Sequence, residues 1–415
     1  MIGRGSMDTA GMYRILDYQL WLDYVEEFKQ KNPRKRDEIA CYEQILSSSR
    51  YQSLAASVLN KGFGFSPPQE IKISKMKTGK KRTVYIHQPE EKLVLRIVNK
   101  ILQTQKLYCE SLCFSFHPGG GAAAAYRSLL SDKRLYEKCS VKLDVHDYFN
   151  SIDVPGMMHI LSERLDTSSP EYTLVKNLLE DQRVLRGGSP AISQHKGVMA
   201  GNPLAPLLSN IYLSDIDEAF RQEGITYARY SDDIIFFVEE EQLEEKMTWL
   251  KKMLSEKGLS INPEKTKIRM QGQSWEFLGL CHDKTGTTLA YGTIEKLKAK
   301  VYRLAKKMRR KIVKGYCSPV MAAKEMISLL NRKLFGKVDE QTRFYWSRWF
   351  FPVMDVSTPL RELDGYIQEK LRYVVTGKYN RANFRKVPYH LLKELGYRSL
   401  VSEFYRFKQD RNQPA

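Results

Sequence analysis

Three acidic residues stand at the ends of segments whose composition favours β-strands. Asp144 closes an apolar run, and Asp232 and Asp233 follow Ser231 in a short turn between two further apolar runs. An adjacent acidic pair alone has a simple explanation, because Asp is favoured in turns. Three carboxylates on neighbouring strand ends are also the oxygen ligands that two Mg²⁺ ions require, and two ions roughly 3.5–4 Å apart can clamp the attacking and leaving oxygens of a phosphoryl transfer. The pattern therefore indicates metal-dependent phosphoryl transfer.

The strongest strand signals of the chain surround these acids. Ser140–Val145 contains the first acid, and Thr226–Tyr230 and Ile234–Glu239 form a hairpin pattern around the other two. The elements that follow are a helix and two short strands, at Glu241–Lys257, Ile268–Met270 and Trp275–Leu280. This order of elements predicts an α+β fold in which helices pack on one face of an antiparallel sheet.

The flanking segments are mostly helical. Met12–Leu59 has the pattern of two or three helices broken near Asn32-Pro33, and two β-prone runs at 71–75 and 83–87 predict a hairpin with Gly79 in its turn. Helices are predicted over Glu90–Thr104 and Ala122–Leu130, and the chain is expected to turn helical after Gly286. One apolar stripe marks that last helix, at Ile294, Leu297, Val301, Leu304, Met308 and Ile312.

The charge of the chain points to a polyanionic partner. Its 415 residues include 67 Lys and Arg against 48 Asp and Glu, which gives a formal net charge of +19. Nucleic acid is the first expectation, an anionic membrane surface the second, and a merely solvated basic surface the plain alternative. Residues 296–343 hold 15 Lys and Arg and only 3 Asp and Glu, which favours a surface that follows phosphates. No apolar run approaches the ~18 residues of a membrane span, so we expect no membrane association.

The cysteines argue against a protein stabilised by disulfides or zinc, and the first residues argue against a secreted one. Six scattered cysteines without a CxxC pair support neither a disulfide framework nor a zinc site, and they fit a reducing cytoplasm. Met1–Ser6 lack the apolar core of a signal peptide, and we interpret them as a leader ahead of a native start at Met7.

Five motifs in this order resemble those of reverse transcriptases. Asp144 is followed five residues later by Phe149, and the remaining motifs are Gly201–Leu213, Tyr230–Asp233, Gly258–Lys267 and Phe277–Leu280. The resemblance covers roughly residues 70 to 345. It is to the bacterial group of retron, group II intron and defence-associated enzymes, and most of all to the last of these.

The resemblance implies a right-hand polymerase with fingers, a ferredoxin-like palm with an antiparallel sheet, and a helical thumb. The boundaries we expect are a leader at 1–6, an N-terminal helical region at 7–65, fingers at 66–138, palm at 139–288, a basic thumb at 289–345 and a helical RNA-binding extension at 346–415.

The resemblance also assigns roles at the site. Asp144 and Asp232 would be the principal ligands of two Mg²⁺ ions, for which Mn²⁺ could substitute, with Asp233 adjacent and the backbone of Val145 facing the triphosphate. Phe149 occupies the steric-gate position that excludes a 2′-hydroxyl, although ordinary core packing is the alternative. Lys265 matches a residue that protonates the leaving pyrophosphate, and a solvated turn lysine is an equally good interpretation. The nucleotide-binding set is Lys75, Arg82, Asp147, Tyr148, Phe149, Ala200, Gly201 and Lys265, and Phe277, Leu278 and Gly279 resemble the primer grip.

Other positions depart from the family pattern or extend it. Ala200 stands where many relatives have Gln, a side chain that helps position nucleotide and template. Among the cations of the hairpin, Arg82 is our first choice for phosphate contact. The residues expected to bind nucleic acid are Lys300, Arg303, Lys307 and Arg310 in the thumb and Lys378, Arg381, Arg385 and Lys386 in the tail.

The resemblance therefore implies an RNA-directed DNA polymerase in the bacterial cytoplasm. Its partners would be dNTPs, a DNA product and a structured RNA template, and its compact build suits an antiphage defence enzyme that copies a dedicated non-coding RNA. A group II intron-type reverse transcriptase or maturase is the alternative within the class. A non-catalytic RNA-binding scaffold with a retained palm is the alternative from another class, although a scaffold has no need of three like charges.

Overall fold

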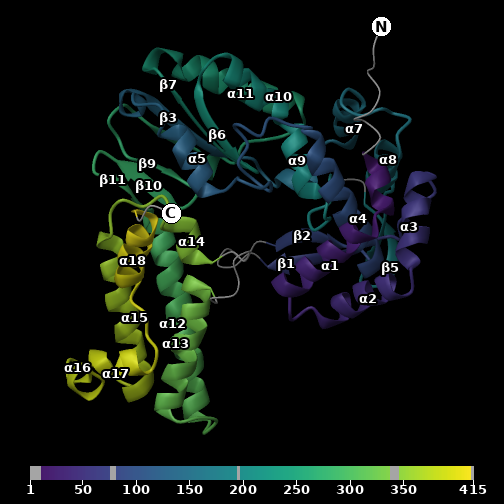
Figure 1. Ribbon diagram of the computed structural model, residues 1–415. Coiled ribbons are helices and arrows are strands. Elements are labelled where there is room, and N and C mark those ends of the chain that lie inside the picture. Colours follow the sequence, from purple (N-terminus) through teal and green to yellow (C-terminus); the bar gives the residue numbers. More distant parts are fainter. Residues whose placement is uncertain (1–10, 75–80, 194–196, 337–344, 413–415) are drawn as a thin grey trace. The chain divides into compact units, whose positions relative to one another are not determined.

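The computed structural model describes residues 11–74, 81–193, 197–336 and 345–412, and its chain forms two compact units (Figure 1). The first unit comprises Met1–Gly121 and Cys139–Ile268, and the second comprises Ala122–Lys138 and Arg269–Ala415. Both units combine helices with sheets of mainly antiparallel strands, which confirms the predicted α+β class. The predicted subdomain boundaries stay predictions.

One four-stranded sheet carries the acidic residues. Its strands are β3 (Cys139–Asp144), β6 (Thr226–Tyr230), β7 (Asp233–Val238) and β8 (Lys267–Arg269), in the order β6-β7-β3-β8. β7 pairs antiparallel with both β6 and β3, so the predicted hairpin and the predicted strand before Asp144 are confirmed. The register places Asp144 opposite Asp233.

Helices α10 (Ser214–Gln222) and α11 (Leu243–Glu256) cover one face of this sheet (Figure 1). Phe220 of α10 stacks on Tyr227 of β6 at 4.4 Å between ring centroids and meets Phe236 of β7 at 5.2 Å and Trp249 of α11 at 5.4 Å. Aromatic burial of this kind fixes the helices to the strands that carry the acids. The first unit also contains α6 (Tyr148–Ser151), α7 (Val154–Ser162), α8 (Pro170–Glu180) and α9 (Ala205–Tyr212), and α7 packs against both α8 and α9.

A second four-stranded sheet has the order β2-β1-β4-β5. β1 (Gln69–Ser74) and β2 (Lys81–Ile86) pair antiparallel, as the hairpin pattern predicts, while the predicted turn residues 75–80 lie outside the described residues. The hairpin of β4 (Arg183–Arg186) and β5 (Ser189–Ile192) was not predicted, although Gly187-Gly188 between them, with φ of 60° and 86°, is a turn signal. Because β1 pairs with β4 in parallel, this sheet is mixed rather than wholly antiparallel.

The N-terminal region of the first unit is helical, as predicted. The break near Asn32-Pro33 falls between α1 (Tyr18–Lys31) and α2 (Arg36–Ser47), and α3 (Arg50–Leu59) follows. The helix predicted from Glu90 is α4 (Pro89–Leu102), and its apolar face is wholly buried in the core of the unit. Short 3₁₀ turns lie at Met12–Leu16, Gln103–Gln105, Leu135–Glu137, Glu240–Gln242 and Pro263–Lys265.

The second unit joins a small sheet to a bundle of helices. β9 (Trp275–Phe277), β10 (Leu280–Asp283) and β11 (Gly286–Leu289) form the sheet, beside α5 (Ala122–Leu129). The prediction that the chain turns helical directly after Gly286 is wrong, because Gly286, at φ 118°, closes a tight turn and the next residues pair with β10. The bundle helices are α12 (Tyr291–Val313), α13 (Pro319–Phe335), α14 (Trp346–Phe350), α15 (Thr358–Thr376), α16 (Asn383–Lys386), α17 (Tyr389–Glu394) and α18 (Leu400–Asn412).

The predicted apolar stripe builds the centre of this bundle. Ile294, Leu297, Val301 and Met308 of α12 are buried, and α12, α13 and α15 pack against one another. Of the helices in the described ranges, none is long and apolar enough to cross a membrane. None of the six cysteines, all of which lie in the described ranges, forms a disulfide bond.

Candidate active site

The end of β3 and the start of β7 bring the three acidic residues together. Asp144 is the last residue of β3 and Asp233 is the first of β7, and the two are register partners. The Val145 amide donates a hydrogen bond of 3.0 Å to the Asp232 carbonyl, which ties the turn of the hairpin to the residue after Asp144. The three carboxylates predicted from the sequence therefore lie together at neighbouring strand ends of one sheet.

Two lysines contact two of the three carboxylates. Lys265 Nζ lies 2.6 Å from Asp144 Oδ1, and Lys142 Nζ lies 3.3 Å from Asp233 Oδ1. Burial, which is the largest cause, and the negative charges of Asp233 and Asp144 together raise the pKa of Asp232 to about 6. Burial opposes the charge of Lys265, but the hydrogen bond and the field of Asp144 outweigh it and raise the Lys265 pKa. Negative charge is thus in excess at this edge and attracts cations.

The donor set suits hard metal ions, although it is not drawn together as a cluster. Within residues 11–74, 81–193, 197–336 and 345–412, no three His, Cys, Asp or Glu side chains form a group that could hold a metal ion. The two ion pairs of the site agree with this absence of a metal-binding group, because Asp144 and Asp233 each point a carboxylate at a lysine. The Val145 side chain is buried, so only its backbone could reach a metal. The raised pKa of Asp232 means that its ionised form is disfavoured at this site. Mg²⁺ would relieve this, because it binds carboxylate oxygens and offsets their negative charge.

A small cavity of about 120 Å³ lies beside the carboxylates. It gathers seven residues of the predicted site together with Val145, whose backbone follows Asp144, and it therefore unites segments far apart in the sequence. Its lining is Arg82, Asp144, Val145, His146, Asp147, Tyr148, Phe149, Asp232, Asn262 and Lys265.

Phe149 and Arg82 form one wall of this cavity. The Arg82 guanidinium lies 5.7 Å from the centroid of the Phe149 ring, and the ring is half-buried against the core. Phe116, which sequence reasoning missed, meets the same ring at 6.3 Å and Tyr230 at 6.1 Å. Its backbone is left-handed, at φ 62°, and its side chain is 41% exposed, which is unusual for a bulky residue. The turn residues Pro118-Gly119 just after it were the only sequence signal.

Ala200 and Gly201 serve the site through strand β2 rather than by lining the cavity. The Tyr85 amide donates to the Ala200 carbonyl at 2.8 Å. Asn150 adds a second tie, because its Oδ1 accepts from the Ala200 amide at 3.2 Å and its Nδ2 donates to the Thr83 carbonyl at 3.3 Å. Gly201 is required here, since its φ is 105° and a Cβ would lie 2.7 Å from the Tyr85 carbonyl oxygen. These contacts hold the strand that carries Arg82.

The remaining predicted nucleotide-binding residues lie in different places. The Tyr148 side chain is buried and its hydroxyl donates to the Ser209 carbonyl at 2.5 Å, so it belongs to the core and only its backbone can face a nucleotide. Asp147 is exposed and left-handed, at φ 41°, at the start of α6. Lys75 lies outside the described residues.

The predicted primer-grip residues belong to the second unit. Phe277 is fully buried, and its carbonyl accepts a hydrogen bond of 2.8 Å from the Tyr126 hydroxyl. Leu278 and Gly279 are both left-handed, at φ 49° and 84°, and the Gly279 carbonyl accepts from Thr293 Oγ1 at 2.7 Å. The three residues therefore form a rigid turn between β9 and β10.

The predicted basic residues form two exposed groups in the second unit. Lys300, Arg303, Lys307 and Arg310 recur at helical spacing along α12, and all four are exposed. Partial burial and the neighbouring cations Lys333, Arg303 and Lys296 lower the pKa of Lys300, which shows how concentrated the positive charge is. The second group surrounds α16 and comprises Lys378, Arg381, Arg385 and Lys386, which are also exposed.

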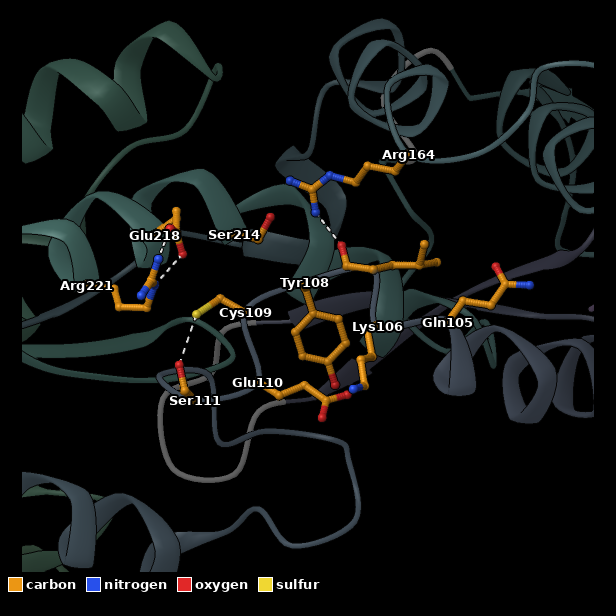
Figure 2. A pocket seen from close by; sticks show the side chains of 11 residues that line it. Gln105, Lys106, Tyr108, Cys109, Glu110, Ser111, Arg164, Ser214, Glu218 and Arg221 are labelled. Carbon is orange, nitrogen blue, oxygen red and sulfur yellow. Dashed lines mark hydrogen bonds and ion pairs between the residues drawn. The ribbon is translucent and has the colours of Figure 1, made fainter. Parts of the chain in front are cut away.

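A larger hollow of about 780 Å³ lies elsewhere in the first unit (Figure 2). Arg164 donates to the Leu107 carbonyl at its rim, and Arg221 pairs with Glu218. None of the sequence-predicted site residues lines it. Both of its arginines contact groups of the protein itself and none of the predicted carboxylates lies here, so the small cavity remains the candidate active site.

Comparison with known proteins agrees with this geometry. Residues 73–282 match the family described as reverse transcriptase (RNA-dependent DNA polymerase), and this span contains the carboxylates, Arg82 and Lys265. The Retron Ec48 reverse transcriptase of Escherichia coli is 23% identical over 242 residues, which cover 54% of this chain and 55% of that protein. An uncharacterized 91 kDa protein in the cob intron of Schizosaccharomyces pombe is 26% identical over 170 residues, which cover 39% of this chain and 20% of that protein.

The chain spans about half or less of the length of these curated relatives. Among solved structures, telomerase from Candida albicans, in complex with a fragment of telomeric RNA, aligns over 90% of this chain and 72% of that chain. The sequence identity is 12% and the TM-score is 0.45.

Proposed function

The chain belongs to the reverse transcriptase family, and from this premise we propose that it is an RNA-directed DNA polymerase. The observation that carries the proposal is the shared sheet edge of Asp144 and Asp232, inside the span that matches the family. In the reaction, the 3′-hydroxyl of a primer attacks the α-phosphorus of a dNTP. The new bond joins the 3′-oxygen to that phosphorus, the bond to the β-phosphate breaks, and pyrophosphate leaves.

Two Mg²⁺ ions, or Mn²⁺ in their place, would be held by Asp144, Asp232 and the Val145 backbone, with Asp233 beside them, and would supply positive charge to the reacting phosphate. The chain's own residues do the rest. Lys265 holds a proton on Nζ within 2.6 Å of Asp144, where it can balance the carboxylate and pass a proton to the departing pyrophosphate. Arg82 also lines the cavity and offers its guanidinium to the phosphates.

Replacing Arg82 with Ala should raise the KM for dNTP about 10- to 100-fold, because a charge-assisted hydrogen bond contributes about 1.5–3 kcal/mol. The kcat should change less, since the carboxylates remain in place. Arg186 of the same sheet is the matched control, because it is exposed and pairs with Glu70 rather than facing the cavity. Steady-state primer extension measures both constants. An equal rise in KM for Arg186→Ala would show that the effect is general and not local to the cavity.

Replacing Phe149 with Ala should weaken selection against ribonucleotides by on the order of 10- to 100-fold, since excluding one small group from a pocket is usually worth about that much. The half-buried ring, fixed by Arg82 and Phe116, supports this steric role. The measurement is the ratio of kcat/KM for dNTP and rNTP on one primed RNA template. A ratio unchanged from wild type, in a variant that still folds, would leave Phe149 as a core residue only.

We further propose that the two basic groups of the second unit bind the RNA template. Replacing Lys300, Arg303, Lys307 and Arg310 together with Gln should lower RNA affinity and reduce the slope of log K against log salt by roughly 3, as expected when four phosphate contacts are lost at about 0.7–0.9 each. Filter binding across a salt series measures this. Replacing Lys252 and Lys29, two exposed lysines of the first unit, with Gln is a control for lost positive surface charge, and an equal change of slope per cation removed would argue against the assignment.

The biological setting belongs to the same proposal. We propose a bacterial cytoplasmic enzyme that copies a structured, dedicated non-coding RNA in antiphage defence, which the retron relative and the free cysteines support. The intron-encoded relative keeps an intron-type enzyme as the second candidate. The deciding experiment adds Mg²⁺ and dNTPs to the protein with its co-purifying RNA and sequences both RNA and product. Tight RNA binding without DNA synthesis on any primed RNA would instead favour a non-catalytic scaffold.

A further inference from the structure

The residue before the catalytic carboxylate is held in a strained conformation. Ser231 has a left-handed backbone, with φ of 60°, although it is not glycine. This conformation strains a non-glycine residue, which keeps it only when its surroundings impose it. The Ser231 side chain is buried, and its hydroxyl has no hydrogen-bond partner among the described residues, so the constraint must act on the backbone.

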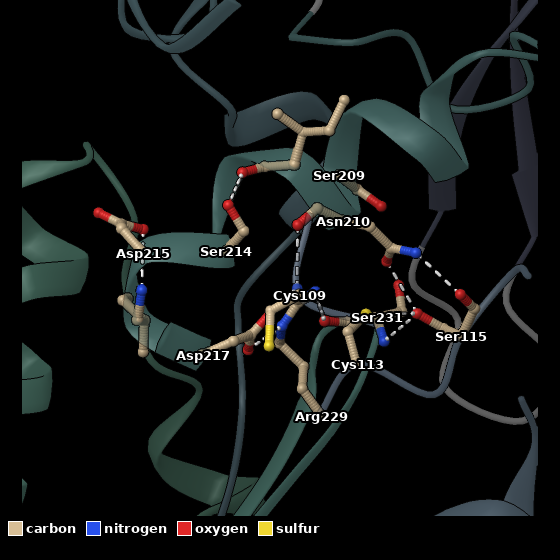
Figure 3. Close-up of polar contacts among 12 residues, drawn as sticks. Cys109, Cys113, Ser115, Ser209, Asn210, Ser214, Asp215, Asp217, Arg229 and Ser231 are labelled. Atoms are coloured by element: carbon tan, nitrogen blue, oxygen red, sulfur yellow. Dashed lines mark hydrogen bonds and ion pairs between the residues drawn. The ribbon is translucent and has the colours of Figure 1, made fainter. Parts of the chain in front are cut away.

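Two side chains hold the Ser231 backbone from opposite sides (Figure 3). The Ser231 amide donates to Ser115 Oγ at 3.0 Å, and the Ser231 carbonyl accepts from Arg229 Nη1 at 3.4 Å. Ser115 is itself fixed by Asn210, because Ser115 Oγ donates to Asn210 Oδ1 at 2.9 Å and Asn210 Nδ2 donates to the Ser115 carbonyl at 2.8 Å. The hydroxyl therefore has both of its roles defined and cannot rotate freely.

Arg229 is fully buried and anchored just as firmly. Its Nε and Nη2 donate to the two carboxylate oxygens of Asp217, at 2.8 and 2.5 Å, and Nη2 also donates to the Asn210 carbonyl at 3.0 Å. Burial disfavours the charged guanidinium, but the adjacent Asp217 carboxylate raises the Arg229 pKa well above its ordinary value. The Tyr227 hydroxyl donates to the same carboxylate at 2.7 Å. A buried guanidinium that is held by an ion pair and several hydrogen bonds is fixed in one orientation.

We propose that Ser115 and Arg229 are positioning residues that impose the left-handed conformation of Ser231 and so aim Asp232 at the site shared with Asp144. Asn210 and Asp217 act through them. We call Ser115 and Arg229 the clamp. They hold the Ser231 backbone, and the Val145 amide holds the Asp232 carbonyl, so the backbone on both sides of the Asp232 side chain is fixed. The expected effect on kcat rests on the proposed polymerase function, whereas the hold on the Ser231 conformation does not.

Ser115→Ala tests the clamp by primer extension. We expect kcat to fall about five- to tenfold with the KM for dNTP within about twofold, since the hydrogen bonds of the Ser115 hydroxyl to the Ser231 amide and to Asn210 are both lost away from the nucleotide. Ser214→Ala is the matched control, because Ser214 is also a buried serine of this unit but its hydroxyl donates to Ile211 and does not touch the turn. An equal fall of kcat in both variants would overturn the proposal.

Ser231→Gly supplies a test that a merely structural role would not pass. Glycine adopts positive φ without penalty, so the clamp should matter less once the strain is gone. We expect Ser115→Ala to cost less than about twofold in kcat in the Ser231→Gly background, which is a strongly non-additive cycle. Independent, additive effects of the two substitutions would overturn the clamp.

Hydrogen exchange separates failure of this inference from failure of the proposed function. The Ser231 amide should exchange faster in Ser115→Ala than in wild type and remain unchanged in Ser214→Ala, whether or not the protein makes DNA. An unchanged Ser231 amide would remove the clamp while leaving polymerase activity untouched. Absence of DNA synthesis by wild type, together with faster exchange in Ser115→Ala, would remove the proposed function and leave the structural clamp.

Discussion

Replacing Asp232 with Asn should lower the rate of DNA synthesis by on the order of 10³-fold or more, because a neutral amide cannot supply the charge that holds metal ions against the reacting phosphate. Lys265 and Lys142 pair with Asp144 and Asp233 rather than with Asp232, and burial together with the charges of both neighbouring acids raises the Asp232 pKa. RNA affinity should stay within about twofold of wild type, since the phosphate-binding cations are untouched. Primer extension and filter binding measure the two quantities.

The same substitution should not destabilise the metal-free protein. The Asp232 pKa is raised from 3.8 to about 6, so the ionised carboxylate is disfavoured in the folded state and weakens folding as pH rises through that interval. At pH 7.5 in a chelator, hydrogen exchange of the β6 and β7 peptides in Asp232→Asn should therefore be as slow as in wild type or slower. Loss of activity with gain of stability is the signature of a group kept for function.

Asp215→Asn is the matched control for Asp232→Asn. Asp215 lies on α10 of the same unit, is 45% exposed and pairs with Lys257 at 2.8 Å. Its replacement should leave DNA synthesis within about threefold of wild type, since an exposed ion pair contributes little. Activity of Asp232→Asn within tenfold of wild type would contradict the catalytic assignment.

The carboxylates were accessible to sequence reasoning because strand ends and turns are local signals. Asp144 ends a short apolar run and Asp232 lies in the turn of a hairpin pattern, and the pairing of β3 with β7 then brings that turn next to Asp144. The resemblance to reverse transcriptases, rather than local pattern, assigned Arg82, Phe149 and Lys265 to the site. Most of the residues that line the small cavity were predicted only because the two kinds of reasoning were combined.

The residues that hold the site in place were not predictable from local pattern. Ser115 lies 116 positions before Ser231, and Asp217 lies 12 before Arg229, so their contacts exist only once the segments are packed. Phe116 escaped for a further reason, because a left-handed phenylalanine contradicts its own backbone preference. The small strands β4 and β5 were missed because four-residue runs give little periodicity.

The buried pair Asp217–Arg229 gives the largest expected effect on stability. Both side chains are completely buried, so Asp217→Ala would leave the guanidinium without its counter-charge. Breaking such a pair typically costs about 3–5 kcal/mol of folding free energy. Because the chain has two units, one unfolding midpoint would not report this loss, and hydrogen exchange of the peptides of β6 and β7 is the better measurement.

Removing the charges together should restore most of that stability. In the triple variant Asp217→Leu, Arg229→Met and Tyr227→Phe, apolar groups of similar volume replace the pair and the hydroxyl that donates to it. Replacing a whole buried ion pair by well-packed apolar residues is often neutral. The exposed pair Glu218–Arg221 on the same helix is the control, and its loss should leave exchange of β6 and β7 unchanged.

The triple variant also separates stability from positioning. Its fold should recover, but the Ser231 carbonyl still lacks the Arg229 donor, so kcat should remain about fivefold below wild type, the value of one lost hydrogen bond. Recovery of both stability and kcat would mean that the pair only stabilises the core. If hydrogen exchange of β6 and β7 in the single variant Asp217→Ala is as slow as in wild type, the pair does not stabilise the core either.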